Sequence, residues 1–402
     1  MRKNACKGAQ NGTGRMSIQY VVMSVEKGFN GHHLAAIDAA IGAAIAARSL
    51  PGAVYRLERG AVHAERAYGR LDFGPAAAPV TVDTVFDVAS LTKVLVTAPA
   101  ILLLHEAGQI DLEAPLLRYL PDCAGGGKDA ITVRQLLTQT SGLLAGLPAS
   151  PAWQGREAAL LLASLERVTH VPGSVFRYSD INYILLGLLV ERVAGMPLDT
   201  FAEQRIFAPL GMLDTGYRPL ARGGGRTIAP TQRGAADAGA VLSKAQRGLA
   251  PGAVLQGQVH DPTVRRMGGV AGSAGVFSTA RDVARFARML LANGEPEGVR
   301  VLHPDSVRLL CTAQSPPGIA ALRGMGMDID SPFARRPRGR HFRLGSYGHT
   351  GFTGCILWID PLSGSFYVFL SNRVYPDDRN SILPLYAELG TLSAEAVLSA
   401  QQ

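Results

Sequence analysis

The feature that most constrains the fold is the position of the strand patterns, which occur near both ends of the chain and flank a long helical middle. Residues 53–71 alternate apolar and polar side chains around Arg59-Gly60, which predicts a β-hairpin. Residues 355–359 and 365–370 are apolar segments separated by a turn, which predicts a strand pair. A single sheet built from both ends, with a helical insertion between them, is the simplest arrangement.

Apolar residues at helical spacing predict several helices along the rest of the chain. The predicted segments are residues 34–48, 90–108, 132–139, 183–193, 279–291 and the tail 382–402. Ser278 is the predicted cap of the helix over residues 279–291. Residues 223–257 are rich in Gly, Ala and Arg without a period, so we expect a long loop region there.

These patterns divide the chain into a sheet domain, residues 31–135 and 265–402, and an all-helical domain, residues 136–264. Residues 1–30 are set apart as a leader that we expect to be disordered, with Met16 and Met23 as candidate starts. No small-residue cleavage site follows the short apolar stretch near Met23, so we expect a cytoplasmic location. A periplasmic or exported location is the alternative if the start lies elsewhere.

The formal net charge of +8 raises the question of a nucleic-acid or membrane partner. The excess is local, because it lies in residues 1–27 and in the arginines of residues 334–343, where no acid occurs. No nucleic-acid partner is therefore expected. We interpret the arginine segment as a solvated loop, with steering of anionic substrates as the alternative. The longest apolar run, residues 94–104, is shorter than the roughly 20 residues that span a bilayer, so no membrane span is expected.

Ser90-Leu91-Thr92-Lys93 lies at the predicted start of a helix. Side chains three positions apart lie on one side of a helix, so the serine hydroxyl and the lysine amine can meet. A serine hydroxyl is a poor nucleophile unless a neighbouring group takes its proton. Taken alone, the pattern fits a helix-capping serine and a solvated lysine better than a catalytic pair.

Tyr178-Ser179-Asp180 lies between a Pro-Gly turn and a predicted helix. A tyrosine at such a corner can serve as a base if its pKa falls, and moving that pKa from about 10 to near 7 costs roughly 4 kcal/mol. An ammonium such as that of Lys93 can supply much of this stabilisation. A packed aromatic ring with its hydroxyl bonded to the backbone is the simpler alternative for this motif alone.

His349-Thr350-Gly351 precedes the C-terminal strand pair. A glycine at a strand lets a ligand approach the backbone closely, and the N–H of Phe352 can point into a site. A turn with a hydrogen-bonded histidine is the simpler alternative for this triplet alone.

The three motifs in this order carry a resemblance to the serine beta-lactamase-like hydrolases, which include class C beta-lactamases, DD-carboxypeptidases and related esterases. The resemblance runs from about residue 37 to residue 374. Further segments similar to those of the family are residues 136–143 (LLTQTSGL), 209–212 (PLGM), 268–272 (GGVAG), 348–354 (GHTGFTG) and 358–361 (WIDP).

The resemblance implies an α+β fold in which helices flank an antiparallel sheet, with an inserted all-helical domain and the site between the two. It implies that Ser90 is the acylated nucleophile and that Lys93 and Tyr178 share the general-base work. The backbone N–H groups of Ser90 and Phe352 would form the oxyanion hole. Residues 349–351 would line the substrate pocket, and neither a metal nor a cofactor is expected.

The chain departs from the family pattern at three positions. Many members carry Asn where this chain has Asp180, and we predict that Asp180 holds Lys93 as an ammonium. Lactamases usually carry Lys-Thr-Gly in the third motif, whereas His349 is largely neutral at pH 7, which lowers the expectation of efficient beta-lactam hydrolysis. Gln139 replaces a commoner His, and we expect only a structural effect.

The predicted function is hydrolysis of small ester or amide substrates through an acyl-enzyme, most simply by a carboxylesterase-type enzyme. A DD-carboxypeptidase or weak class C-like beta-lactamase acting on a peptide or lactam is the alternative. A penicillin-binding sensor or scaffold that acylates without turnover is the alternative from another class. The sequence leaves the oligomeric state open.

Overall fold

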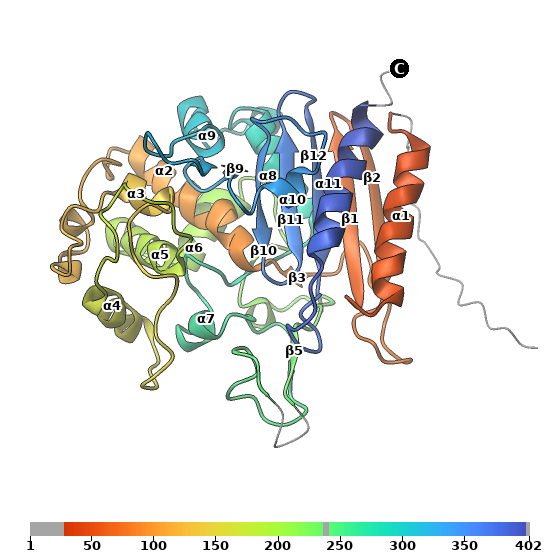
Figure 1. Ribbon diagram of the computed structural model, residues 1–402, viewed down its shortest axis with the longest axis horizontal. Coiled ribbons are helices and arrows are strands. Elements are labelled where there is room, and N and C mark those ends of the chain that lie inside the picture. Colours follow the sequence, from red (N-terminus) through yellow and green to blue (C-terminus); the bar gives the residue numbers. More distant parts are fainter. Residues whose placement is uncertain (1–27, 236–240, 399–402) are drawn as a thin grey trace, which may run out of the picture.

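The computed structural model describes residues 28–235 and 241–398 and contains a seven-stranded antiparallel sheet with the strand order β2-β1-β12-β11-β10-β9-β8 (Figure 1). The strands are β1 (Gly52–Arg59), β2 (Val62–Gly69), β8 (Leu322–Arg323), β9 (Asp328–Asp330), β10 (Tyr347–Gly351), β11 (Cys355–Asp360) and β12 (Ser365–Ser371). Strand β1 pairs antiparallel with β12, and Ala53 lies opposite Ser371. The two ends of the chain therefore share one sheet, as the sequence predicts.

Helices cover both faces of this sheet (Figure 1). One face carries α1 (Gly31–Ala46) and α11 (Leu383–Leu398), which share an apolar cluster with sheet residues such as Trp358 and Tyr367. The short α10 (Arg335–Arg338) packs against α11. The other face carries α8 (Ala280–Leu291) and belongs to a larger apolar cluster that continues into the helices beyond it. Because β11 is buried on both faces, its sequence is continuously apolar up to Asp360.

The helices beyond α8 gather beside the sheet (Figure 1). They are α2 (Ala98–Glu106), α3 (Val133–Leu137), α4 (Arg156–Leu165), α5 (Asp180–Ala194), α6 (Leu198–Ala202), α7 (Pro262–Arg266) and α9 (Pro304–Cys311). Short 3₁₀ turns occur at Ala89–Leu91, Leu116–Arg118, Pro121–Cys123, Pro219–Arg222 and Pro296–Gly298, and π-helical turns at Lys93–Thr97 and Glu203–Phe207. Two minor sheets use β3 (Phe86–Asp87), β7 (Val276–Ser278) and β4 (Gly216–Tyr217), and β5 (Gln232–Arg233) with β6 (Val254–Leu255).

Several boundaries differ from the prediction. The segment over residues 136–264 is not entirely helical, because it contributes β4, β5 and β6, which are two-residue strands too short to show a sequence period. The helix α8 is capped by Thr279 rather than by Ser278, because Ser278 is still paired in β7. Residues 28–30 of the predicted leader belong to the fold, since Phe29 is buried and Asn30 caps α1; residues 1–27 lie outside the described residues.

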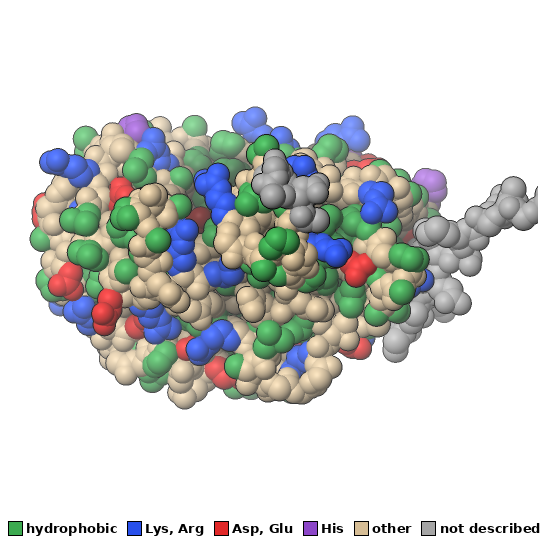
Figure 2. All heavy atoms as spheres, turned by 90° about the horizontal axis from the view of Figure 1, so that it is seen from below, with side chains coloured by type: hydrophobic (Ala, Val, Ile, Leu, Met, Phe, Trp, Pro, Cys, Tyr) green, Lys and Arg blue, Asp and Glu red, His purple; other side chains and the backbone are tan. Residues whose placement is uncertain are grey.

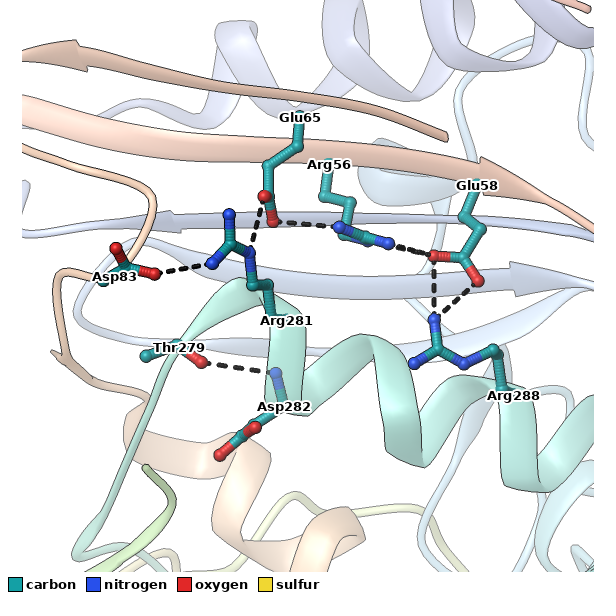
Figure 3. Close-up of polar contacts among 8 residues, drawn as sticks. All are labelled: Arg56, Glu58, Glu65, Asp83, Thr279, Arg281, Asp282 and Arg288. Atoms are coloured by element: carbon teal, nitrogen blue, oxygen red, sulfur yellow. Dashed lines mark hydrogen bonds and ion pairs between the residues drawn. The ribbon is translucent and has the colours of Figure 1, made fainter. Parts of the chain in front are cut away.

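A buried charged network joins the N-terminal hairpin to α8 (Figure 3). The Arg56 guanidinium donates from Nε and Nη2 to Glu58 Oε2, at 2.9 and 2.7 Å, and from Nη1 to Glu65 Oε1 at 3.0 Å. From α8, Arg288 Nη1 contacts Glu58 Oε1 at 2.8 Å and Arg281 Nε contacts Glu65 Oε2 at 2.8 Å. These charged groups lie between the sheet and α8, so each of them is stabilised there by its oppositely charged partners.

One helical segment, Ala89–Glu106, has the length and hydropathy that a membrane-spanning helix needs. It is also 83% buried inside the fold, which is the position of a core helix in a globular domain.

Candidate active site

Ser90 follows β3 at a sharp backbone turn. Ala89, just before it, has φ +46°, a left-handed conformation that costs an L-residue about 1–2 kcal/mol. The turn is held by Asp87 Oδ1, which accepts the Ala89 N–H at 2.9 Å. It leaves Ser90 half-buried at the wall of a pocket.

Lys93 lies beneath Ser90 and is completely buried. Its Nζ donates to Ser90 Oγ at 3.1 Å, to Asp180 Oδ1 at 2.7 Å and to the Ser273 carbonyl at 2.8 Å. Burial lowers the pKa of Lys93, but its interactions with the Asp180 carboxylate and with Tyr178 outweigh this, and its pKa lies above the ordinary value. All three N–H bonds of the ammonium thus have acceptors, in agreement with the predicted pairing of Asp180 with Lys93.

The Tyr178 corner is held by α3 and by the residues that follow it. Gln139 Oε1 accepts the Ser179 N–H at 2.9 Å and the Asn182 amide at 2.6 Å, so the residue that replaces the family's His braces the corner. Ser179 in turn caps α5. The Tyr178 ring is placed against Lys93, whose Nζ lies 5.1 Å from the ring centroid.

Strand β10 brings the third motif to the serine. A Cβ on Gly351 would lie 2.4 Å from the Val88 carbonyl, so this glycine is required by the approach of the chain's own backbone rather than by a ligand. In the described part of the chain, outside regular helices and strands, neither the Ser90 N–H nor the Phe352 N–H donates a hydrogen bond. Both groups are thus available to a bound oxygen.

His349 is buried and its ring centroid lies 6.0 Å from that of Tyr178. Its Nδ1 lies 2.8 Å from the Thr350 carbonyl, which can only accept, so Nδ1 carries the proton. Burial lowers the pKa of His349 well below the ordinary value, and the charges of Arg323 and Lys93 lower it further. The imidazole is therefore neutral near pH 7, as predicted, and provides no fixed positive charge.

A pocket of about 1000 Å³ joins these residues. It is lined by Ser90, Tyr178, Asp180 and residues 349–352, with Lys93 bonded directly beneath, so the structure brings all eight predicted site residues together. Figure 2 shows the side of the molecule that carries α7, with Lys and Arg side chains spread over its middle. The lining cations are Lys244, Arg247, Arg266, Arg323, Arg373 and Arg379.

The arginine segment over residues 334–343 does not supply this charge. None of its arginines is among the lining residues that the structure describes, and its helix α10 packs against α11. Arg338 forms an ion pair with Asp330 at 2.9 Å. Phe333, immediately before the segment, does line the pocket, and its ring lies tilted against that of Tyr178 with 5.5 Å between ring centroids.

The prediction missed four contributors to the site. The Ser273 carbonyl binds Lys93, and the similarity of the preceding GGVAG segment to the family was the available signal. Arg323 and Asp328 lie together in the pocket wall, from strands too short to be recognised. Asp87 holds the turn before Ser90 and was signalled only by its position three residues before the serine.

His260-Asp261, a pair of adjacent titratable side chains, braces a loop. The His260 N–H donates to Asp87 Oδ2 at 2.7 Å, and Asp261 caps α7. Burial lowers the pKa of His260 to about 3, with help from Arg265 and Arg373. Across residues 28–235 and 241–398, no cluster of three or more His, Cys, Asp or Glu side chains suits a metal ion.

The sheet with helices on both faces is the fold of several penicillin-binding-protein and beta-lactamase-like proteins. A penicillin-binding protein homologue from Caulobacter crescentus has a TM-score of 0.69 with 20% identity, covering 90% of this chain and 97% of that one. EstCE1, described as a hydrolase with promiscuous acyltransferase activity, has a TM-score of 0.67 with 23% identity, covering 90% of this chain and 99% of that one.

Comparison of the amino-acid sequence with known proteins identifies the family of this chain. The Beta-lactamase family model matches residues 37–391. A protein of Escherichia coli (strain K12) named "Putative D-alanyl-D-alanine carboxypeptidase" is 32% identical over 310 residues, in an alignment that covers 73% of this chain and 70% of that protein. The chain belongs to the Beta-lactamase family and is a serine hydrolase.

Proposed function

We propose that the protein hydrolyses small esters or amides through an acyl-enzyme on Ser90, as a carboxylesterase-type member of its family. The observation that carries the proposal is the contact of Ser90 Oγ with a buried ammonium, at 3.1 Å, beside two N–H groups that have no acceptor among the described residues. The exposed ring of Phe352 and the ring of Phe333 offer an apolar wall to an acyl chain. A neutral His349 favours substrates that need no cation at that position.

Lys93, Tyr178 and the two backbone N–H groups have separate roles in the proposed reaction. Lys93 has its three N–H bonds occupied and acts as a cation, so Tyr178 is the group that takes the Ser90 proton. Ser90 Oγ adds to the substrate carbonyl carbon while the carbonyl π electrons move onto the oxygen, which gives a tetrahedral oxyanion. The intermediate collapses when the carbonyl re-forms and the leaving-group bond breaks, and Tyr178 passes the proton to the leaving group. The N–H groups of Ser90 and Phe352 stabilise the oxyanion. Water then repeats the sequence and releases the acid.

Asp180→Asn tests the charge arrangement. Because the carboxylate raises the pKa of Lys93, its removal should lower that pKa. If the Lys93 cation is needed, the alkaline limb of the kcat/KM profile should move to lower pH, with activity near pH 7 reduced about tenfold. The measurement is the pH dependence of p-nitrophenyl ester hydrolysis. An unmoved profile would show that Asp180 does not control the site's charge.

A substrate panel tests the function itself. The purified protein is incubated with p-nitrophenyl esters of short acids, a D-Ala-D-Ala peptide and nitrocefin, and separately with a fluorophosphonate whose attachment site is mapped by mass spectrometry. We expect labelling of Ser90 and fastest turnover of the esters. Labelling at Ser90 without turnover of any substrate would favour a penicillin-binding sensor. Absence of labelling would contradict the nucleophile assignment.

A second candidate, a DD-carboxypeptidase, is favoured by Arg323. Its side chain is 1% exposed and lies in the pocket wall, with the guanidinium carbon 6.0 Å from the Tyr178 ring centroid. Among the described residues its Nε and Nη1 have no hydrogen-bond partner, although Nη1 lies 3.4 Å from Asp328 Oδ2. A buried guanidinium with unused donors suits a carboxylate, the group at the end of a peptide.

Arg323→Gln separates the two candidates. If Arg323 binds a terminal carboxylate, KM for a D-Ala-D-Ala peptide should rise about 10- to 100-fold, because a hydrogen bond to a charged group contributes about 1.5–3 kcal/mol. KM for a neutral p-nitrophenyl ester should change little, and this ester is the control for correct folding. An equal effect on both substrates would contradict carboxylate binding.

A further inference from the structure

Asp87 is a buried carboxylate whose two oxygens accept N–H groups from two distant parts of the chain. Oδ1 accepts from Ala89 at 2.9 Å, and Oδ2 accepts from His260 at 2.7 Å. Among the described residues it forms no ion pair within 4 Å, so backbone amides rather than a cation hold it. A structural cap needs only one such contact, whereas Asp87 bridges two loops.

Each of these loops supports one of the two candidate oxyanion donors. Ala89 is bonded directly to Ser90, and its left-handed conformation is accompanied by the contact of its N–H with Asp87. The His260 ring stacks on the Phe352 ring with 5.7 Å between centroids. The Asp87 backbone carbonyl also accepts the Thr353 hydroxyl at 2.6 Å, next to Phe352.

We infer that Asp87 is a positioning residue that sets the spacing between the Ser90 and Phe352 N–H groups. This inference rests on the proposed function, because those two groups matter only if an oxyanion forms between them. An oxyanion hole works through donors fixed in advance at about 2.7–3.1 Å from the developing charge. One side chain that ties both supporting loops fixes that distance through the backbone of those loops.

The surroundings of Asp87 make this role sensitive to pH. The pKa of Asp87 is raised to about 6, mainly by burial; the two N–H contacts and Arg265 oppose this rise, and the Asp261 charge adds to it. The other titratable neighbours are His260, which is neutral, and Cys355, whose thiol lies 3.6 Å from the Asp87 carbonyl. Below about pH 6 the Asp87 carboxyl becomes protonated and loses part of its capacity to accept hydrogen bonds. The fall of activity at acidic pH should therefore follow the protonation of Asp87.

Asp87→Asn is the first test. The amide can accept only one of the two N–H groups, so kcat for an ester and the rate of fluorophosphonate labelling should each fall about 10- to 100-fold, with KM changed little. The acidic limb near pH 6 should disappear. Asp282→Asn is the matched control, because Asp282 is also a buried aspartate that accepts a backbone N–H, from Asp214, but lies outside the pocket.

Thr353→Val is the second test, for the event that Asp87→Asn folds poorly. It removes the contact with the Asp87 carbonyl and keeps the carboxylate, so labelling should slow severalfold while the acidic limb stays near pH 6. Wild-type labelling kinetics in Asp87→Asn, or an equal loss in Asp282→Asn, would overturn the inference. Failure of the wild-type protein to label would instead overturn the proposed function, so the two failures are distinguishable.

Discussion

Replacing Ser90 by Ala should lower kcat/KM for any ester that the wild-type protein hydrolyses by about 10⁴- to 10⁶-fold. The Ser90 hydroxyl contacts the buried Lys93 ammonium, and in the proposed mechanism it is the group that forms the acyl-enzyme, so its loss should abolish that intermediate. Lys93 keeps its contacts with Asp180 and the Ser273 carbonyl, and the fold should therefore be unaffected. The measurement is steady-state hydrolysis combined with fluorophosphonate labelling.

Ser381→Ala is the matched control for this prediction. Ser381 lines the same pocket, but no hydrogen bond of its side chain is present in the described structure. Its replacement should leave turnover within about twofold, an amount that corresponds to less than 1 kcal/mol. Persistence of labelling in Ser90→Ala would show that another side chain is the nucleophile.

Replacing Arg56 by Met should lower the free energy of unfolding by about 3–5 kcal/mol. The guanidinium donates three hydrogen bonds to Glu58 and Glu65, whose side chains are only 3% exposed (Figure 3). Without it, the ion-pair partners that remain to Glu58 and Glu65 among the described residues are Arg288 and Arg281 of α8, and part of the buried negative charge is uncompensated. Denaturant unfolding followed by circular dichroism measures the loss.

Two further variants separate the effect of the buried charges on the free energy of unfolding from the effect of lost packing. Arg281→Met removes a contact to the same Glu65 from a side chain that is 43% exposed, and should cost about 1 kcal/mol or less. Combining Arg56→Met with Glu58→Gln and Glu65→Gln should recover much of the loss, because the buried charges are then gone. A loss in Arg56→Met no larger than that in Arg281→Met would contradict this account of the network.

The sequence predicted those parts of the molecule that have a local pattern. The hairpin β1–β2 and the pair β11–β12 alternate or run apolar over several residues, and their pairing is confirmed. The Ser90–Lys93 contact follows from helical spacing, and their common pocket with Tyr178 and residues 349–351 follows from the order of motifs in a known family. Their roles in the reaction stay predictions.

The missed features depend on contacts between residues that are far apart in the sequence. Arg323 lies in a two-residue strand, and nothing near it in the sequence shows that it faces Tyr178. The Ser273 carbonyl is a backbone group and leaves no side-chain signature. Asp87 accepts from His260, which is more than 170 positions away. Such pairings are set by tertiary packing, which a single sequence does not display.

The pairing of β1 with β12 has a consequence for the order in which the molecule assembles during synthesis. Ala53 lies opposite Ser371, so the hairpin must wait for most of the chain before its neighbour emerges from the ribosome. Closing so long a loop is slow compared with forming the local helical contacts around α5. The nascent chain therefore leaves the edge of β1 that faces β12 unpaired for most of translation, and unpaired strand edges favour aggregation.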